Sequence, residues 1–314
     1  MKCSVIILNW NGWQDTLQCL ESLMAIKEPE IDVLVVDNGS SDESTVKIEE
    51  FISDNQRLDR RGSVSISLIK NKENLGFAGG NNVGIKEAYK QGANYILLLN
   101  NDTIVDPDFL KEMLAVMEKH HTIGLANPKI YRMAENGEKT NRFWFAGADI
   151  NWLHTKGMHR FLNEEDSGQL DGHEYVETGY ATGGCLLIRR QTLEEIHLMP
   201  EDYFLYYEDA EWSLHARKAG WLCAVIPSAK VWHKGAASTR ERSVKYVRYH
   251  VRGGFFLCLR NAPLWKIIPA YLWSIPRAGW HAVKWLFLPE KRPFAAGVML
   301  GIWDAWLHRI GKIV

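Results

Sequence analysis

The sequence predicts an α/β protein: a mostly parallel sheet flanked by helices and extended at its C-terminal end by further helices. Two observations support this prediction. Short apolar runs alternate with amphipathic stretches over residues 1–125, as in sheets whose parallel strands are joined by helices. Residues 240–314 instead interleave Trp and Leu with Lys and Arg, a pattern typical of amphipathic helices.

Four apolar runs are the strand candidates of the first part. Each is rich in Val, Ile and Leu and almost uninterrupted, as expected for strands buried on both faces. The runs cover residues 4–10, 32–38, 65–71 and 94–100, and helical patterns lie at 14–26, 44–52 and 80–91. In the first of these patterns, Leu17, Leu20, Leu23 and Met24 recur at helical spacing.

The composition, with 46% hydrophobic and 24% charged residues, is that of an ordinary globular protein. A chain of 314 residues is long enough for one large domain or two. The net charge of −1 hides an asymmetry, because residues 240–314 contain 13 Lys and Arg against 3 Asp and Glu. This basic segment predicts an anionic partner, either a membrane surface or a nucleic acid.

Polar residues follow every strand candidate. They are Asn9 after the first, Asp37 after the second, Asn74 to Asn82 after the third, and Asn100, Asn101 and Asp102 after the fourth. Turns and helix caps use the same residue types. Ligands of such sheets, however, bind beyond the carboxyl ends of the strands. Four polar ends on one edge therefore favour a nucleotide site over four separate caps.

The stretch "NLGFAGGNNVG" contains Gly76, Gly79 and Gly80, which would let the backbone approach a ligand closely. The helix expected after it would offer free N–H groups to phosphate. Asn74 and Asn81 are therefore candidate nucleotide-binding residues together with Gly76. Neither the Gly-x-Gly-x-x-Gly spacing of dinucleotide sites nor the lysine of a P-loop is present here.

Three later stretches make a family resemblance specific: "TGGCLLIRR" (182–190), "YFLYYEDAEWSLHARKAGW" (203–221) and "VIPSAKVWHKGAAS" (225–238). Together with "DNGSSD" and "NND", this order resembles glycosyltransferase family 2, and within it the rhamnosyltransferase-like bacterial members that build surface polysaccharides. The resemblance implies an inverting transferase of the GT-A fold. It implies a catalytic domain over 1–239, with a nucleotide-binding half at 1–125 and an acceptor half at 126–239, and a separate helical region at 240–314.

The resemblance also implies roles in donor binding. Asp37 matches the acidic residue that contacts the nucleotide base, Asp102 the acid that binds the metal, and His233 the distant histidine that completes the metal and pyrophosphate site. Asn100 and Asn101 depart from the family pattern, which has acids there, so the expected affinity for Mg²⁺ or Mn²⁺ is reduced. A hydrogen-bonded, half-buried histidine is the alternative for His233.

On the acceptor side, the resemblance makes Asp209 of "YEDAEW" the base that deprotonates the acceptor hydroxyl. Glu208 would orient the site, and Gly183 and Gly184 would leave room for a sugar. From the residues alone, the acids also suit the start of a helix that ends near Ala219, and the two glycines suit a tight turn.

The C-terminal segment carries six of the 13 Trp residues, between Trp265 and Trp306. Charged residues interrupt its apolar runs, so we expect no membrane-spanning helix. Four prolines, at 269, 276, 289 and 293, would divide it into short pieces. Helices lying on an anionic membrane are the favoured interpretation, and packing on the catalytic domain or on a second subunit is the alternative. Nucleic acid is not expected as a partner, because the basic residues form no recognised reading motif.

The expected compartment follows from cysteines and the N-terminus. Five scattered cysteines, an odd number without a Cys-x-x-Cys pair, argue against a disulfide framework or a zinc site and favour a reducing cytosol. The first residues enter a strand-like run without the layout of a signal peptide. We therefore expect a cytoplasmic protein, peripheral on the inner face of the cell membrane, where lipid-linked glycans are assembled.

Three functions remain open from the sequence. The first is transfer of a sugar, rhamnose from dTDP-rhamnose in the simplest case, from a dTDP- or UDP-sugar to a glycan or polyprenyl-linked glycan, by a monomer or a homo-oligomer. The second is silent binding of a nucleotide or glycan, which Asn100 and Asn101 keep open. The third is a nucleotide-dependent oxidoreductase, which the missing dinucleotide fingerprint disfavours.

Overall fold

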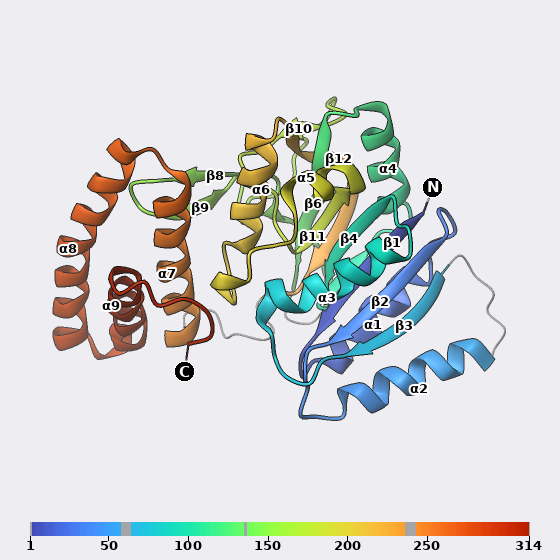
Figure 1. The fold of residues 1–314 in the computed structure, drawn as a ribbon, viewed down its shortest axis with the longest axis horizontal. Helices are drawn as coiled ribbons and strands as arrows, with labels where there is room; N and C mark the ends of the chain where they lie inside the picture. Colours follow the sequence, from blue (N-terminus) through green and yellow to red (C-terminus); the bar gives the residue numbers. More distant parts are fainter. Residues whose placement is uncertain (1, 58–63, 135–136, 236–242, 314) are drawn as a thin grey trace.

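One large sheet organises the first three quarters of the chain (Figure 1). The computed structural model describes residues 2–57, 64–134, 137–235 and 243–313. The strand order is β10-β12-β6-β11-β4-β1-β2-β3, with β5 beside β12 and β7 beside β6, and β8 and β9 form a separate hairpin. The strands are β1 (Cys3–Asn9), β2 (Ile31–Asp37), β3 (Val64–Lys70), β4 (Tyr95–Asn100), β5 (Thr103–Val105), β6 (Ile123–Met133), β7 (Lys139–Phe145), β8 (Ala148–Asn151), β9 (Lys156–His159), β10 (Val176–Glu177), β11 (Cys185–Arg189) and β12 (Leu222–His233).

Helices cover both faces of this sheet, so this part of the chain has three layers. One core cluster joins the sheet to α1, α2 and α4, through Leu20, Ile48 and Met113, for example. The other joins it to α3, α5 and α6, through Ile85 and Trp212, for example. The helices are α1 (Trp13–Leu23), α2 (Ser44–Arg57), α3 (Gly76–Lys90), α4 (Phe109–Lys119), α5 (Arg190–Ile196), α6 (Glu208–Lys218), α7 (Val244–Asn261), α8 (Leu264–Phe287) and α9 (Arg292–Trp306), with short 3₁₀ turns η1 (Glu201–Tyr203) and η2 (Pro289–Lys291).

The four predicted strands are confirmed, each to within one residue at its ends, as β1 to β4. They run parallel in the order β4-β1-β2-β3. The chain builds outward from β1 to β3 and then returns to the other side of β1 as β4. The strand order therefore reverses beside β1, and the carboxyl ends of β1 and β4 flank the place where ligands of open α/β sheets bind.

The second half of the sheet is mixed rather than parallel. β11 lies antiparallel between β4 and β6, while β12 runs parallel to β6. The expected mostly parallel arrangement thus describes residues 3–100 better than the acceptor half. Among the described residues, β5 to β10 and β12 were not predicted. β5 and β7 to β10 are too short or too polar to give a clear periodic signal. β6 and β12 are long, but proline and lysine interrupt their apolar runs.

Two local predictions were wrong. The glycine stretch does not precede a helix but lies inside α3, which begins at Gly76. Pro269 and Pro276 do not divide the C-terminal segment, because α8 continues through both of them. Both prolines lie on the exposed side of α8. The carbonyls of Trp265 and Leu272, which lose their helical donors, therefore lie on a side that water can reach.

The three C-terminal helices pack mainly on one another (Figure 1). Gly297 and Gly301 let α9 approach α7, because a Cβ atom at either position would lie 2.7 Å from the Cβ atom of Val247 or Val251. The boundary expected at residues 239 and 240 lies outside the described residues. In the part of the chain that the structure describes, no helix is both long enough and apolar enough to cross a bilayer.

Candidate active site

Asp102 and His233 meet because of strand pairing. β5 runs antiparallel to β12, and in this register Thr103 lies opposite His233. Asp102, the residue before Thr103, therefore places its Oδ1 3.0 Å from Nε2 of His233. Both side chains are buried. Two residues 131 positions apart in the sequence thus form one polar pair at the edge of the sheet.

Asn100 and Asn101 point to different neighbours. Nδ2 of Asn100 lies 3.2 Å from Nε2 of His233, so this amide belongs to the same group as Asp102. The Asn101 amide instead donates to the carbonyl of Gly12 and to Oγ1 of Thr16, at 3.2 and 3.0 Å. Asn100 is therefore placed beside the candidate metal ligands, whereas Asn101 fixes the start of α1.

Asp37 is held by a network at the ends of β1 and β2. Asn9 lies opposite Asp37 in the parallel register and donates to its Oδ1 at 2.8 Å. The backbone N–H and the hydroxyl of Ser40 donate to the same carboxylate at 3.0 and 2.6 Å. Asp37 is only 1% exposed, so in this structure its carboxylate orders the loop after β2.

The glycines of α3 approach other parts of the protein. A Cβ atom at Gly76 would lie 2.4 Å from the backbone oxygen of Phe204, and one at Gly80 would lie 2.4 Å from Cδ1 of Leu8. Gly76 also has a φ of +79°, which favours glycine. These glycines therefore allow close packing of α3 against β1 and the loop before α6.

Asn74 and Asn81 are both engaged locally. Asn74 accepts a hydrogen bond from the N–H of Gly76 at 2.8 Å, and Asn81 donates to the carbonyl of Phe77 at 2.9 Å. The sequence analysis missed Asn38, which is buried and accepts from the N–H of Leu75 at 3.1 Å. Asn38 also donates to Asn74 at 3.2 Å. These amides join the ends of β2 and β3 to the first turn of α3.

Asp209 lies against the Gly183–Gly184 turn. The N–H of Gly183 donates to Oδ2 of Asp209 at 2.8 Å, and a Cβ atom at Gly183 would lie 2.9 Å from the ring of Phe77. The next residue, Gly184, accepts from the N–H of Asn100 at 3.0 Å through its carbonyl. The turn therefore joins Asp209 to the end of β4.

Burial shapes the protonation of the two acids at the start of α6. Desolvation raises the pKa of Asp209, and the N–H groups of Gly183 and Ala210 oppose this by binding the carboxylate. Desolvation, and then the nearby charge of Asp209, raise the pKa of Glu208 to about 8. Oε2 of Glu208 has no hydrogen-bond partner among the described residues. Glu208 is thus neutral at acidic and neutral pH and keeps a second negative charge away from Asp209.

The loop before α6 is strained and is braced by α7. Phe204, Tyr206 and Tyr207 have φ values of 65°, 69° and 76°, a region that costs non-glycine residues about 1–3 kcal/mol each. The Tyr206 ring stacks on His250 of α7 with centroids 3.9 Å apart, and the Phe204 ring stacks on Tyr249. Phe204 and Tyr206 therefore pack against α7.

Two further residues of the site were missed. Asn127 donates to the carbonyls of Thr182 and Cys185 and accepts from the N–H of Thr182 at 3.1 Å, which fixes the glycine turn. A buried polar residue within an apolar strand is the signal that could have revealed it. Trp144 packs edge-on against His233, with centroids 4.4 Å apart, and would contact a Cβ atom at Gly184 at 3.2 Å.

The Asp102–His233 pair fits a divalent metal. Their Oδ1–Nε2 distance of 3.0 Å is that of a hydrogen bond or ion pair, so His233 is a hydrogen-bonded histidine in this structure. The same separation also suits two ligands at right angles around an octahedral Mg²⁺ or Mn²⁺, each about 2.1 Å from the ion. No group of three or more His, Cys, Asp or Glu that could hold a metal occurs within the described residues. Mg²⁺ usually takes only one or two protein carboxylates and completes its shell with substrate phosphates and water.

Three of the four residues on which the site depends are joined by a path of contacts. Asp209 reaches Asn100 through the Gly183–Gly184 turn, Asn100 contacts His233, and His233 contacts Asp102. Asp37 follows the neighbouring strand pair at the same edge. The arrangement places a candidate cation site beside a raised-pKa carboxylate at the end of β4.

This sheet, with its candidate site at the carboxyl ends of the strands, is the arrangement of the GT-A class of nucleotide-sugar transferases. A family model described as glycosyl transferase family 2 matches residues 4–197, and the chain belongs to this family. A low-salt glycan biosynthesis hexosyltransferase of Haloferax volcanii is 24% identical over 98% of this chain and 92% of its own. A dTDP-rhamnosyl transferase of Shigella flexneri is 23% identical over 86% of this chain and 84% of its own.

The solved structures agree in fold. A mannosyltransferase from Pyrobaculum calidifontis, determined in complex with GDP-Man and Mn²⁺, superposes with a TM-score of 0.59 at 13% identity and covers 98% of this chain and 88% of its own. The protein is therefore a glycosyltransferase of family 2 with the GT-A fold, and the oxidoreductase alternative is removed.

Proposed function

We propose that the protein is an inverting, metal-dependent hexosyltransferase that moves a sugar from a nucleoside diphosphate to the hydroxyl of a glycan. The observation that carries this proposal is the contact path from Asp209 to the Asp102–His233 pair. A single displacement needs a base for the acceptor and a cation site for the donor. Asp209 and the Asp102–His233 pair would supply these two groups, and both adjoin the end of β4.

The donor side is assigned to the ends of β1, β2 and β4. Asp102 and His233 would hold Mg²⁺ or Mn²⁺, and Asn100 would add an amide oxygen or a hydrogen bond beside them. The ion, when bound, supplies Lewis-acid charge that neutralises the departing nucleoside diphosphate. Asp37 is assigned to the base of the nucleotide, either directly or by ordering the loop that contacts it, with Asn9, Asn74, Gly76, Asn81 and Asn101 shaping the surrounding backbone.

Asp209 is assigned as the general base. As the acceptor oxygen attacks the anomeric carbon from the face opposite the diphosphate, the hydroxyl becomes acidic and Asp209 takes its proton. The burial that raises the pKa of Asp209 makes its carboxylate a stronger base than an exposed aspartate, and general-base help of this kind gives roughly 10²–10⁴-fold in rate. Gly183 and Gly184 leave space on the acceptor side, and neutral Glu208 limits charge repulsion near Asp209.

The donor is proposed to be dTDP-rhamnose, with UDP-hexoses as the competing candidates. The rhamnosyl transferase of Shigella flexneri, which aligns along most of both chains, supports this choice. A screen of purified protein with dTDP-rhamnose, UDP-hexoses and GDP-mannose, with and without Mn²⁺, tests it by release of the nucleoside diphosphate. Release from dTDP-rhamnose that needs Mn²⁺ and leaves a product of inverted anomeric configuration is the expected result. Nucleotide binding without any turnover would favour the silent-binding alternative.

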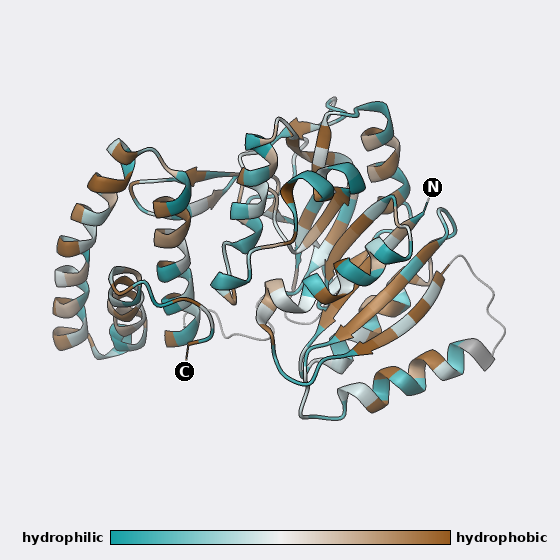
Figure 2. Cartoon of the chain, viewed as in Figure 1, coloured by the Kyte–Doolittle hydropathy of each residue, from teal (hydrophilic) through white to brown (hydrophobic). Residues whose placement is uncertain are grey.

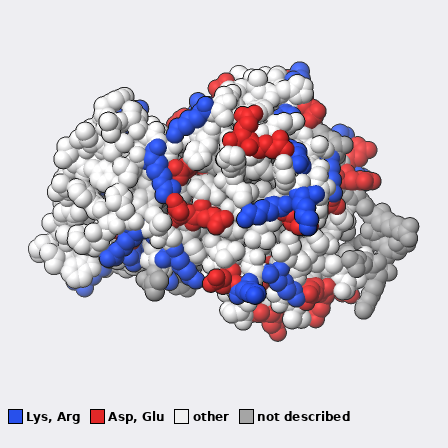
Figure 3. Space-filling model, viewed as in Figure 1, with Lys and Arg blue, Asp and Glu red and all other residues white. Residues whose placement is uncertain are grey.

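The acceptor is proposed to be lipid-linked, with the protein peripheral on the inner face of the cell membrane. The support is the surface of α8, whose large apolar side chains are exposed over most of its length, including Leu264, Trp265, Ile268, Leu272, Ile275, Trp280, Leu286 and Phe287. Brown apolar residues recur along α8 in Figure 2, and the helical end of the molecule carries few charges on the face seen in Figure 3. Soluble proteins seldom leave so large an apolar surface uncovered unless a partner or membrane covers it.

A further inference from the structure

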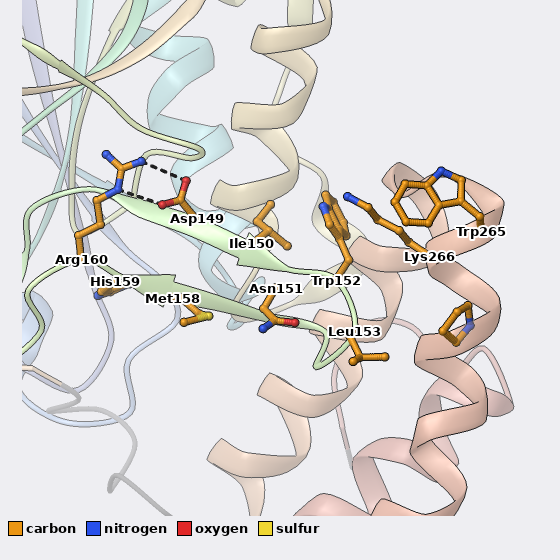
Figure 4. Close-up of a pocket in the computed structure, with 11 residues that line it drawn as sticks. Asp149, Ile150, Asn151, Trp152, Leu153, Met158, His159, Arg160, Trp265 and Lys266 are labelled. Carbon is orange, nitrogen blue, oxygen red and sulfur yellow. Dashed lines mark hydrogen bonds and ion pairs between the residues drawn. The ribbon is translucent and has the colours of Figure 1, made fainter.

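A groove lies between the β8–β9 hairpin and the first turns of α8 (Figure 4). Its volume is about 710 Å³, within the usual range for sites that bind small molecules. The hairpin contributes both of its strands and the turn between them, and α8 contributes its first two turns. The lining residues are Asp149, Ile150, Asn151, Trp152, Leu153, Met158, His159, Arg160, Trp265, Lys266 and Pro269.

The lining combines six apolar residues with Asp149, Asn151, His159, Arg160 and Lys266, and Lys266 is the cation on the helix side. Trp152 and Leu153 of the hairpin face Trp265 and Lys266 of α8 across the groove (Figure 4). Arg160 gives two hydrogen bonds to Asp149, at 2.9 and 3.0 Å, so these two charges neutralise each other. The ammonium group of Lys266, 4.9 Å from the Trp265 ring, is the positive charge that α8 brings to the groove.

The groove connects two regions already described. At one end, Trp265 is 71% exposed and continues into the exposed apolar surface of α8. At the other end, His159 hydrogen-bonds the carbonyl of Trp144 at 2.9 Å. Trp144 in turn packs against His233. A ligand along the hairpin would therefore run from the surface of α8 toward the carboxyl edge of the sheet.

We propose that this groove binds the isoprenoid phosphate portion of a lipid-linked acceptor. The apolar chain lies between Trp152 and Trp265, the phosphate pairs with Lys266, and the sugar extends past His159 toward Asp209. This inference rests on the proposed function and adds to it the part of the protein that recognises the acceptor. A water-soluble glycan fits less well, because the charged pair in the groove is already satisfied and the remaining walls are mostly apolar.

The chain provides a matched test within α8. Trp265 and Lys266 line the groove, whereas Trp280 and Lys284 form a similar pair, 5.2 Å apart, on the same helix away from the groove. Binding of a fluorescent farnesyl phosphate, kept in solution without vesicles, is measured on the full chain by anisotropy. Losing the apolar contact of one tryptophan or the charge of one lysine should weaken binding about tenfold, so Trp265→Ala and Lys266→Glu should each do so. Trp280→Ala and Lys284→Glu should leave binding unchanged.

Three outcomes would overturn the proposal. The control pair could weaken binding as much as the groove pair, which would indicate nonspecific adsorption to α8. Inorganic phosphate could displace the probe as well as unlabelled farnesyl phosphate does, which would leave no role for the apolar chain. The wild-type protein could fail to bind the probe at all. Titration of dTDP with Mn²⁺ on the same variants checks the donor site separately, so failure of the groove is distinguished from failure of the transferase assignment.

Discussion

Most proteins bury apolar side chains and expose ionisable ones, and two regions of this molecule depart from that rule in different ways. At the carboxyl edge of the sheet, the ionisable side chains of Asp102, Glu208 and His233 are buried. On α8, Leu264 is 75% and Phe287 73% exposed. Buried charge and exposed apolar surface both cost free energy in an isolated protein. The difference indicates that the edge is organised for chemistry, whereas α8 is organised to contact something outside this chain.

The largest expected effect is a loss of sugar transfer when Asp209 is replaced, compared with replacement of an aspartate elsewhere on the protein. Asp209→Asn keeps the hydrogen bond to Gly183 possible but cannot accept a proton, so the rate of transfer should fall by roughly 10²–10⁴-fold. Donor binding should remain. Single-turnover transfer at saturating nucleotide sugar measures this, with Asp108→Asn, an exposed aspartate before α4, as the control. Normal transfer by the Asp209→Asn protein would show that the base lies elsewhere.

The next effect concerns the protonation of Glu208, a buried acid at the edge of the sheet. Because the pKa of Glu208 is raised to about 8, the folded protein keeps a proton that the unfolded chain releases at lower pH. The stability that this proton provides is complete below the ordinary glutamate range and is lost as the pH rises through about 8. A glutamine at position 208 cannot ionise, so Glu208→Gln should not lose this stability. Its free energy of unfolding, relative to that of the wild type, should therefore rise by on the order of a few kcal/mol as the pH increases from about 5 to about 9.

Urea unfolding at the two pH values measures this difference. A Glu208→Gln protein whose stability changes with pH as the wild type does would mean that Glu208 is ionised in the folded state. Glu208 would then no longer count as a buried neutral acid in the comparison between the edge and α8.

A smaller effect is expected on α8. Leu272→Glu combined with Leu286→Glu places two charges on its exposed surface and should weaken binding to vesicles that contain phosphatidylglycerol by at least about tenfold. Both leucines are exposed, so the free energy of unfolding should change by less than about 0.5 kcal/mol each. Vesicle sedimentation measures binding, and Val46→Glu, an exposed apolar position on α2, is the control. Unchanged sedimentation with a newly monomeric protein would assign α8 to a second subunit.

The smallest effect sharpens the role of the two amides after β4. Asn100→Asp adds a carboxylate beside His233 and should raise the affinity for Mn²⁺ in the presence of dTDP by about threefold to tenfold. Asn101→Asp is the matched control, because the Asn101 side chain bonds Gly12 and Thr16. Equal gains in both variants would mean that added negative charge acts at a distance and not through coordination.

Much of the fold could be predicted from local pattern. The strands β1, β2 and β4 are buried on both faces, and their continuous apolar runs gave their positions. The position of β3 was predicted, but its burial on both faces was not correct, because β3 is an edge strand whose residues are only partly buried or exposed. The start of α3 could not be found in this way, because Gly76, Gly79 and Gly80 are poor helix formers that are tolerated where close packing needs them. The continuity of α8 was missed because a proline usually ends a helix, unless the affected turn faces outward as at Pro269 and Pro276.

The candidate site could be predicted only in part. Asp102, His233 and Asp209 were found through motifs in their family order, and the structure brings them together. Trp144 acts through its contact with His233, far away in the sequence, so no local pattern identifies it. Asn127 could have been noticed only as a polar residue within the apolar residues of β6. The groove beside α8 could not be predicted either, since its two walls are at least 105 residues apart in the sequence, the separation between Arg160 and Trp265.

The most direct test of the account is calorimetric titration of dTDP, with and without Mn²⁺, into the wild type and three variants. Wild type, Asp209→Asn and the Leu272→Glu, Leu286→Glu protein should bind dTDP in a Mn²⁺-dependent manner with equal affinity, and Asp102→Ala should lose that dependence. Mn²⁺-dependent binding that survives in Asp102→Ala, or that disappears in Asp209→Asn, would contradict the division of the edge into a donor side and a base.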